Sequence, residues 1–258
     1  MTSKRAQRDC LNERRTAPMR GLPKGVVLAG LLAVSAFAAG SVHRAAEAAD
    51  CGSMPTAGLD WSDCKKRNLI LQGSNLEGAK LMGTDFDATD LSNSNLKWAN
   101  FEKATLVRAW LAGASAEGAN FARIEAYRSS FENIVAEGAS FVGAELQRAS
   151  FAGARLVKAN FEKAELGRAD FEKATLTGAS FSLANMSRAD LSGAILEGPI
   201  SLDRAFLYLT RIEGLDLSAA TGLEQAQIEL ACGDSATKLP PGLSAPSDWP
   251  CPAEKEEQ

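Results

Sequence analysis

A large apolar residue recurs at a spacing of five between Leu71 and Leu196, except at three positions in the middle that hold alanine. The residue two positions before it is small and usually alanine, without interruption from Ala149 to Ala194. This period suits neither a helix, on which five residues turn by ~500°, nor a strand, on which odd steps alternate between faces. A chain that turns after every unit would gather the row into one core, so the pattern predicts a solenoid of stacked coils.

The clearest units are Ala159-Asn160-Phe161, Ala169-Asp170-Phe171 and Ala189-Asp190-Leu191. In these units the sequence resembles the pentapeptide-repeat family, whose motif is A-(D/N)-L-x-x. The resemblance covers 26 consecutive units, about half of the chain. It implies an all-β solenoid, a right-handed quadrilateral β-helix with four pentapeptides per coil. The central Leu or Phe and the preceding Ala would point inward.

The spacing of phenylalanines supports a coil of 20 residues, because two series would each stack on one side of the core. The first series is Phe101, Phe121, Phe141, Phe161 and Phe181, and the second is Phe131, Phe151 and Phe171. In the middle, Ile124 and Ile134 precede Ala126 and Ala136 by two positions. We interpret this as a local exchange of large and small core residues.

Residues 1–48 are interpreted as a targeting leader. Basic residues precede an apolar run from Val26 to Val42, and Ala46-Glu47-Ala48 offers a cleavage site. The expected location is therefore periplasmic or extracellular. An uncleaved leader that anchors the chain in a membrane is the alternative, because a run of 17 residues is near the lower limit of a span. Whether the chain starts at Met1 or Met19 stays open.

Eight of the 28 basic and three of the 32 acidic residues lie in residues 1–49, so the remainder carries a net charge of −9. No direct binding of nucleic acid is expected from such an acidic chain. The only histidine, His43, lies in the leader, which removes Ser–His and Cys–His catalytic sites and most zinc sites. We therefore expect no enzyme activity, no cofactor, and no catalytic or metal-binding residues.

The expected organisation beyond the leader has three parts. Residues 49–68 form an N-terminal cap and residues 69–198 form the β-helix. Residues 199–258 form a C-terminal cap with an irregular coil, a helix at about 221–231 that opens with a capping box from Thr221 to Glu224, and an extended strap. A covered end should discourage end-to-end association, so a monomer is favoured.

The leader aside, the cysteines are Cys51, Cys64, Cys232 and Cys251. An even number of cysteines in an exported chain predicts two disulfides. The pairs Cys51–Cys64 and Cys232–Cys251 are favoured, because the two ends of a ~31 Å rod are too far apart for a disulfide. For the same reason the four thiols cannot form one tetrahedral metal site.

One surface feature could recognise a partner. Five arginines are spaced by 20 residues and should form a column with a spacing of ~4.8 Å: Arg108, Arg128, Arg148, Arg168 and Arg188. Like charges in file repel unless they are compensated. We expect an interleaved lattice of ion pairs with nearby acids, namely Glu125, Glu145, Glu165, Asp170 and Asp190. The alternative is a groove for a polyanion or an acidic partner, with Trp98, Trp110 and Tyr127 as exposed anchors.

The favoured function is a non-catalytic, exported bacterial scaffold that binds a protein or another envelope component of unknown identity. The resemblance supplies an alternative, an acidic DNA mimic that binds DNA gyrase or another topoisomerase. The leader, the paired cysteines and the arginine column depart from that pattern.

Overall fold

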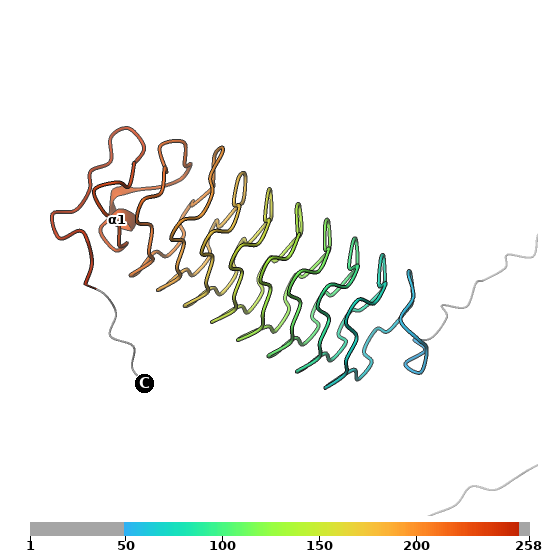
Figure 1. The fold of residues 1–258 in the computed structure, drawn as a ribbon. Coiled ribbons are helices and arrows are strands. Elements are labelled where there is room, and N and C mark those ends of the chain that lie inside the picture. The colour runs from blue at the N-terminus through green and yellow to red at the C-terminus, as the bar shows by residue number, and fades with distance from the viewer. Residues whose placement is uncertain (1–48, 253–258) are drawn as a thin grey trace, which may run out of the picture. The chain divides into compact units, whose positions relative to one another are not determined.

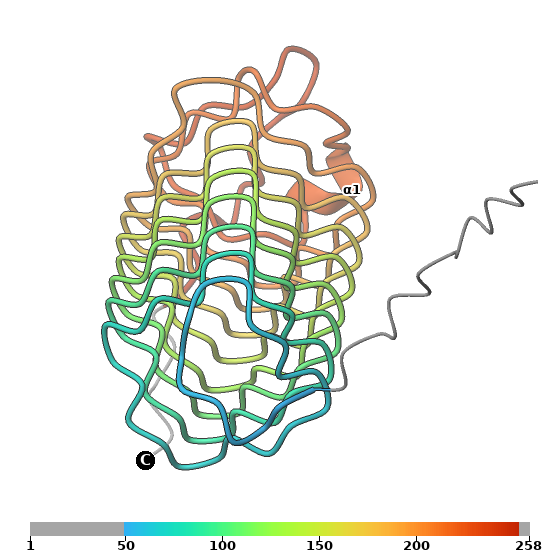
Figure 2. The same ribbon diagram turned by 90° about the vertical axis from the view of Figure 1, so that its right-hand side faces the viewer.

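The structure is a computed structural model that describes residues 49–252, so the expected leader (1–48) lies outside the described residues. Coils follow one another along the solenoid in chain order (Figure 1). The outlines of successive coils lie over one another when the solenoid is seen from its N-terminal end (Figure 2). Parallel β-bridges join each residue before a large core residue to the residue 20 positions later, from Asp60–Lys80 to Thr175–Ile195. This spacing confirms the β-helix with four pentapeptides per coil.

Each pentapeptide places its small and its large residue in the core and then turns a corner. The second corner residue has a positive φ, as at Gly113 (67°) and Lys103 (60°). Glycine adopts this conformation without strain, whereas a residue with a side chain adopts it at a cost of ~1–2 kcal/mol. The corners thus tolerate cationic side chains because the inter-coil hydrogen bonds fix the backbone around them.

The two phenylalanine series form the expected ladders. The ring centroid of Phe141 lies 5.0 Å from that of Phe121 and 4.7 Å from that of Phe161, and the three rings are nearly parallel. Between the ladders the rings meet edge to face, as Phe141 and Phe151 do at 5.6 Å. Stacked and edge-to-face contacts are both favourable for aromatic rings, so the core is stabilised by ring geometry as well as by the burial of apolar area.

The exchange of large and small residues in the middle of the array fills the core. Ile124, Ala126, Ile134 and Ala136 are all fully buried. Isoleucine at the usual alanine position compensates for alanine at the usual Leu or Phe position.

The ladder begins earlier than the sequence predicted, at Asp60 rather than residue 69. Trp61 fills a core position, and the next such position holds Lys66, which is only 7% exposed. The Lys66 ammonium lies 3.6 Å from the centre of the Trp61 ring and donates a hydrogen bond to the Cys51 carbonyl (2.7 Å). Burial lowers the pKa of Lys66. A lysine can take this position because the first coil is the end of the core.

The coils also continue beyond Pro199, so the expectation of an irregular coil is wrong. The bridges Ser180–Ser201 and Asn185–Phe206 join residues 21 positions apart, which shows that the register moves by one residue. Leu202, Leu207 and Ile212 then fill the core at the same period of five. One extra residue is absorbed at a bend that includes Glu197 and Gly198.

The helix α1 spans Gln225–Ile228 and is shorter than the expected 221–231. Thr221 remains in the ladder through its bridge to Ser201, so it cannot cap a helix. The capping box is formed instead by Glu224 and Gln227. Gln227 also donates hydrogen bonds to carbonyl groups of the coil below, which ties α1 to the solenoid.

Two disulfides are present, with the pairing that the sequence favoured. Cys51 joins Cys64 in the N-terminal region, and Cys232 joins Cys251 across 19 positions of sequence. Trp249, beside Cys251, donates a hydrogen bond to the Ala231 carbonyl (2.7 Å). Within residues 49–252 there is no helix of the length and hydrophobicity that a membrane span requires.

Candidate partner surface

The arginine column exists and lies along one corner of the solenoid. Its members occupy the second corner position of five consecutive coils, with φ between 56° and 59°. We call these residues the arginine ridge: Arg108, Arg128, Arg148, Arg168 and Arg188. Because the bridges stack these coils in register, neighbouring members are one coil apart, at ~4.8 Å.

The predicted ion-pair lattice is wrong for four members of the ridge. Within the described residues, no hydrogen bond or ion pair involves the side chains of Arg108, Arg128, Arg148 or Arg168. All four are exposed, whereas Arg188 is half-buried and is left out of this count.

Other cations of the solenoid do pair with acids on an adjacent coil. Arg123 lies 3.1 Å from Glu102, and Lys97 lies 2.8 Å from Glu117. Ion pairs between adjacent coils thus form elsewhere on the solenoid, whereas four of the ridge arginines, Arg108, Arg128, Arg148 and Arg168, form none among the described residues.

The nearby glutamates form a column of their own instead of pairing with the ridge. Glu125, Glu145 and Glu165 occupy consecutive bridge positions in the middle of the adjoining side, each three residues before a ridge arginine. We call them the glutamate ladder. Glu165 accepts a hydrogen bond from Asn185 (2.8 Å), and the other two have no side-chain partner among residues 49–252. Two self-repelling columns of opposite charge therefore run side by side.

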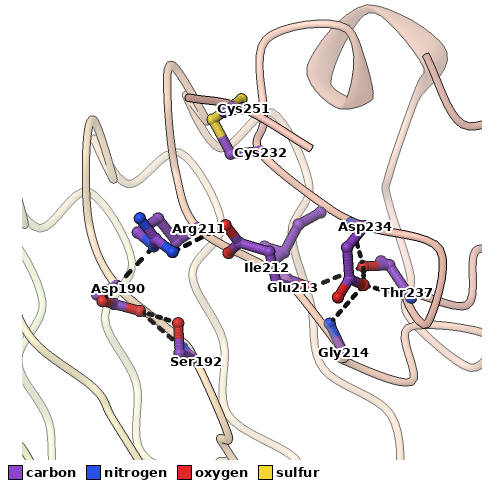
Figure 3. A network of polar contacts seen from close by, with 10 residues as sticks. All are labelled: Asp190, Ser192, Arg211, Ile212, Glu213, Gly214, Cys232, Asp234, Thr237 and Cys251. Carbon is purple, nitrogen blue, oxygen red and sulfur yellow. Dashed lines mark hydrogen bonds and ion pairs between the residues drawn. A yellow bond between two sulfur atoms is a disulfide. The ribbon is translucent and has the colours of Figure 1, made fainter. Parts of the chain in front are cut away.

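In the described part of the chain, the acids past the next corner do not pair with the other four ridge arginines either, Arg188 again being left out. Asp190 and Glu213 flank Arg211, at 3.8 and 3.1 Å (Figure 3). Burial raises the pKa of Asp170, and the nearby Asp190 charge raises it further. On this side of the solenoid, Asp190 and Glu213 therefore pair with Arg211.

The three candidate aromatic anchors are dispersed. Tyr127 is 46% exposed at the corner between the glutamate ladder and the ridge. Trp110 lies on the next side and lines a hollow of about 450 Å³ with Ile70 and Asp90. Trp98 occupies a corner ten residues before Arg108, half a coil away, so it does not belong to this surface.

Two further aromatic residues join this surface and were missed from the sequence. Phe206 (49% exposed) bridges to Asn185 and so extends the column of the glutamate ladder. Tyr208 (43% exposed) follows at the corner, and the two rings stack at 6.3 Å. The shift of register at Pro199 hid them, because a strict period of 20 assigns them to other columns.

The arrangement favours electrostatic recognition. No group of three or more His, Cys, Asp or Glu side chains in the described part of the chain is placed to hold a metal ion. The four cysteines are engaged in disulfides. What the surface offers is a file of exposed guanidinium groups, which bind carboxylate or phosphate through paired hydrogen bonds.

A comparison with models of known protein families agrees with this fold. The model of the family "Pentapeptide repeats" matches eight copies, in residues 70–106, 129–166 and 164–198. No curated protein matches the chain.

Among solved structures, the chain is similar to a trypsin-treated variant of QnrB1, a plasmid-mediated fluoroquinolone resistance protein. The identity is 19% over 72% of this chain and 91% of that chain, with a TM-score of 0.49. HetL, involved in heterocyst differentiation regulation in the cyanobacterium Nostoc, is 24% identical over 72% and 91%, with a TM-score of 0.29. A protein of the Arabidopsis thaliana thylakoid lumen is 24% identical over 55% and 79%, with a TM-score of 0.26. Identities this low say nothing about which molecules this chain binds. Its repeats and its coil show that the chain belongs to the pentapeptide-repeat family.

Proposed function

We propose that this chain is a non-catalytic, exported scaffold that binds an acidic partner along the arginine ridge. The observation that carries the proposal is the unpaired state of Arg108, Arg128, Arg148 and Arg168 among the described residues. Four guanidinium groups at a spacing of ~4.8 Å repel one another, and an anionic partner would relieve that repulsion.

The wider charge balance supports selective rather than general attraction. Beyond residue 49 the chain is acidic overall, so the ridge is a positive stripe on a negative molecule. Such a stripe attracts a partner whose acids match it in line, while the remaining surface repels other polyanions. The alternative function, a DNA mimic that binds gyrase, requires a continuous acidic face. The ridge places a column of positive charges within such a face. We therefore favour the scaffold.

The ridge is tested by removing three of its charges. In the variant with Arg128→Ser, Arg148→Ser and Arg168→Ser, affinity for a fluorescein-labelled polyglutamate peptide is expected to fall about tenfold or more, because three charge-assisted contacts are lost. Fluorescence anisotropy at low salt measures the affinity.

A matched control removes three arginines that pair with acids of the chain itself, by Arg123→Ser, Arg155→Ser and Arg204→Ser. The change in net charge is the same, and we expect less than about a twofold loss of affinity. Equal losses in both variants would show that only net charge matters and would refute the proposal.

Export is tested on the native protein from separated cell fractions. We expect a periplasmic species that begins near Ala49 and gains ~4 Da on reduction, because two disulfides take up four hydrogens. Intact-mass measurement with and without reductant reports both properties. A cytoplasmic, reduced, full-length species would overturn export and would make a gyrase supercoiling assay the next experiment.

A further inference from the structure

We infer that the acidic partner of the arginine ridge is a second copy of this chain, aligned in parallel about a two-fold axis that runs along the solenoid. This inference rests on the proposed function and names the partner of the same surface. Its basis is the way in which the ridge and the glutamate ladder are placed in the same coils.

The two columns match in pitch because one backbone sets both. Glu125 and Arg128 share one coil, Glu145 and Arg148 the next, and Glu165 and Arg168 the one after. Other acidic partners match less well. Acids on one face of an extended strand repeat at ~6.6 Å, and acids one helical turn apart repeat at ~5.4 Å, against ~4.8 Å for the ridge. A second solenoid matches it coil by coil.

Symmetry then selects the orientation. A two-fold axis parallel to the solenoid keeps each coil at its own height and exchanges the two sides of the contact. The arginine of each copy thus faces the glutamate of the same coil in the other copy. An axis across the solenoid would keep the sides and reverse the heights, which would place arginine against arginine. Because the contact is self-complementary, the three coils give six reciprocal ion pairs.

The contact would relieve the repulsion within both columns at once. Within each copy, Arg128, Arg148 and Arg168 repel one another, and so do Glu125, Glu145 and Glu165. Among residues 49–252, no ion pair joins Arg128, Arg148 or Arg168 to the glutamate ladder of the same copy. Pairing them between copies neutralises two repulsive columns without any change in the fold.

The exposed aromatic residues independently favour the parallel orientation. Tyr127 lies between the two columns, and Phe206 and Tyr208 extend the same surface toward the C-terminus. In the parallel dimer Tyr127 and Tyr208, which lie between the two columns, each face their own counterpart, and Phe206 stays beside Tyr208, on which its ring stacks. In the reversed dimer the Phe206–Tyr208 pair would lie against the end of the surface that carries Asp85 and Asp87, two partners of Arg67.

The size of the surface predicts a weak dimer. The paired region extends over only a few coils, which places it near or below the ~1,200 Å² of total buried area typical of stable complexes. Most of the attraction is between exposed charges, which salt screens over ~10 Å at 0.1 M. We therefore expect a dissociation constant of about 10 μM or weaker at low salt, and a monomer at high salt.

Charge reversal tests the pairing. One variant reverses the ridge by Arg128→Glu, Arg148→Glu and Arg168→Glu, and the other reverses the ladder by Glu125→Arg, Glu145→Arg and Glu165→Arg. Sedimentation velocity of the protein as purified from the cell is expected to show a salt-sensitive dimer for the wild type and a monomer for each variant. An equimolar mixture of the variants is expected to restore the dimer, because the reversed ridge of one variant then faces the reversed ladder of the other, while the native ladder of the first faces the native ridge of the second. Restoration also proves that both variants are folded.

Oxidative cross-linking of tyrosine tests the orientation on the unmodified chain, which has only two tyrosines, Tyr127 and Tyr208. Peptide mapping of the cross-linked wild-type dimer should find Tyr127 joined to Tyr127 and Tyr208 joined to Tyr208. Links between Tyr127 and Tyr208 would overturn the parallel alignment. Tyr127→Phe should remove the first product and keep the second.

The remaining outcomes separate this inference from the proposed function. A wild-type chain that stays monomeric at low salt, or a dimer that neither reversal affects, overturns the inference. If the serine variant of the ridge still loses polyglutamate binding, the proposed function survives and the acidic partner is a different molecule. If that binding is also unchanged, both are wrong.

Discussion

Replacement of Phe141 by alanine is expected to lower the free energy of unfolding by about 3–5 kcal/mol, the range for loss of a buried aromatic side chain. The Phe141 ring is fully buried and stacks on Phe121 and Phe161 in the coils on either side. It also meets Phe131 and Phe151 edge to face. A cavity here would lie between four rings that the inter-coil hydrogen bonds hold in place, so little collapse is possible.

Denaturant unfolding followed by circular dichroism measures this loss. Trp98→Ala is the matched control, because Trp98 is also aromatic but is 64% exposed and lies over Gly118. We expect the control to lower the free energy of unfolding by no more than about 1 kcal/mol. If the two variants are destabilised equally, the aromatic ladders do not hold the solenoid together as described.

The second large effect is expected at the C-terminal disulfide. Replacing both Cys232 and Cys251 with serine should cost about 3 kcal/mol, because the closed loop of about 20 residues regains its conformational freedom in the unfolded chain. Cys232 lies in the ladder, bridged to Arg211, while Cys251 belongs to the strap that carries Trp249. The loss should therefore be concentrated at the C-terminal end of the solenoid.

Hydrogen exchange resolves where the stability is lost. Because each coil contacts only its neighbours, amides in residues 200–232 should exchange faster in the variant, while amides around the Phe141 coil should keep their protection. The corresponding variant of Cys51 and Cys64 should show the opposite pattern, with faster exchange near Trp61. Uniform acceleration along the whole chain in either variant would contradict this local account.

The sequence by itself determined the coil. A period of five places Leu or Phe and Ala inward at every turn, and this depends only on local geometry that each pentapeptide repeats. The 20-residue spacing of phenylalanines likewise predicted both ladders. The disulfide pairing followed from the length of the array, because a long rod separates Cys51 and Cys64 from the other two cysteines.

Tertiary structure decided what happens where the pattern is imperfect. The extra residue near Pro199 looked like the end of the array, yet inter-coil hydrogen bonds carry the ladder past it in a new register, as Ser201 and Phe206 show. The sequence placed Lys66 in the cap before the β-helix, yet it occupies a core position, where the Trp61 ring and the Cys51 carbonyl accommodate its side chain. In both places, favourable contacts with the neighbouring parts of the fold outweigh a local sequence that departs from the repeat motif.

The arginine ridge shows the same division between sequence and structure. Spacing by 20 residues placed the five arginines in a column, because register is a property of the repeat. Whether Arg128 or Arg148 reaches an acid depends on the distance around a corner between two columns, which no period along the chain encodes. For the same reason, the structure was needed to place Phe206 and Tyr208 on this surface. The column to which a residue belongs depends on the register between its coil and the preceding coils, and that register shifts near Pro199.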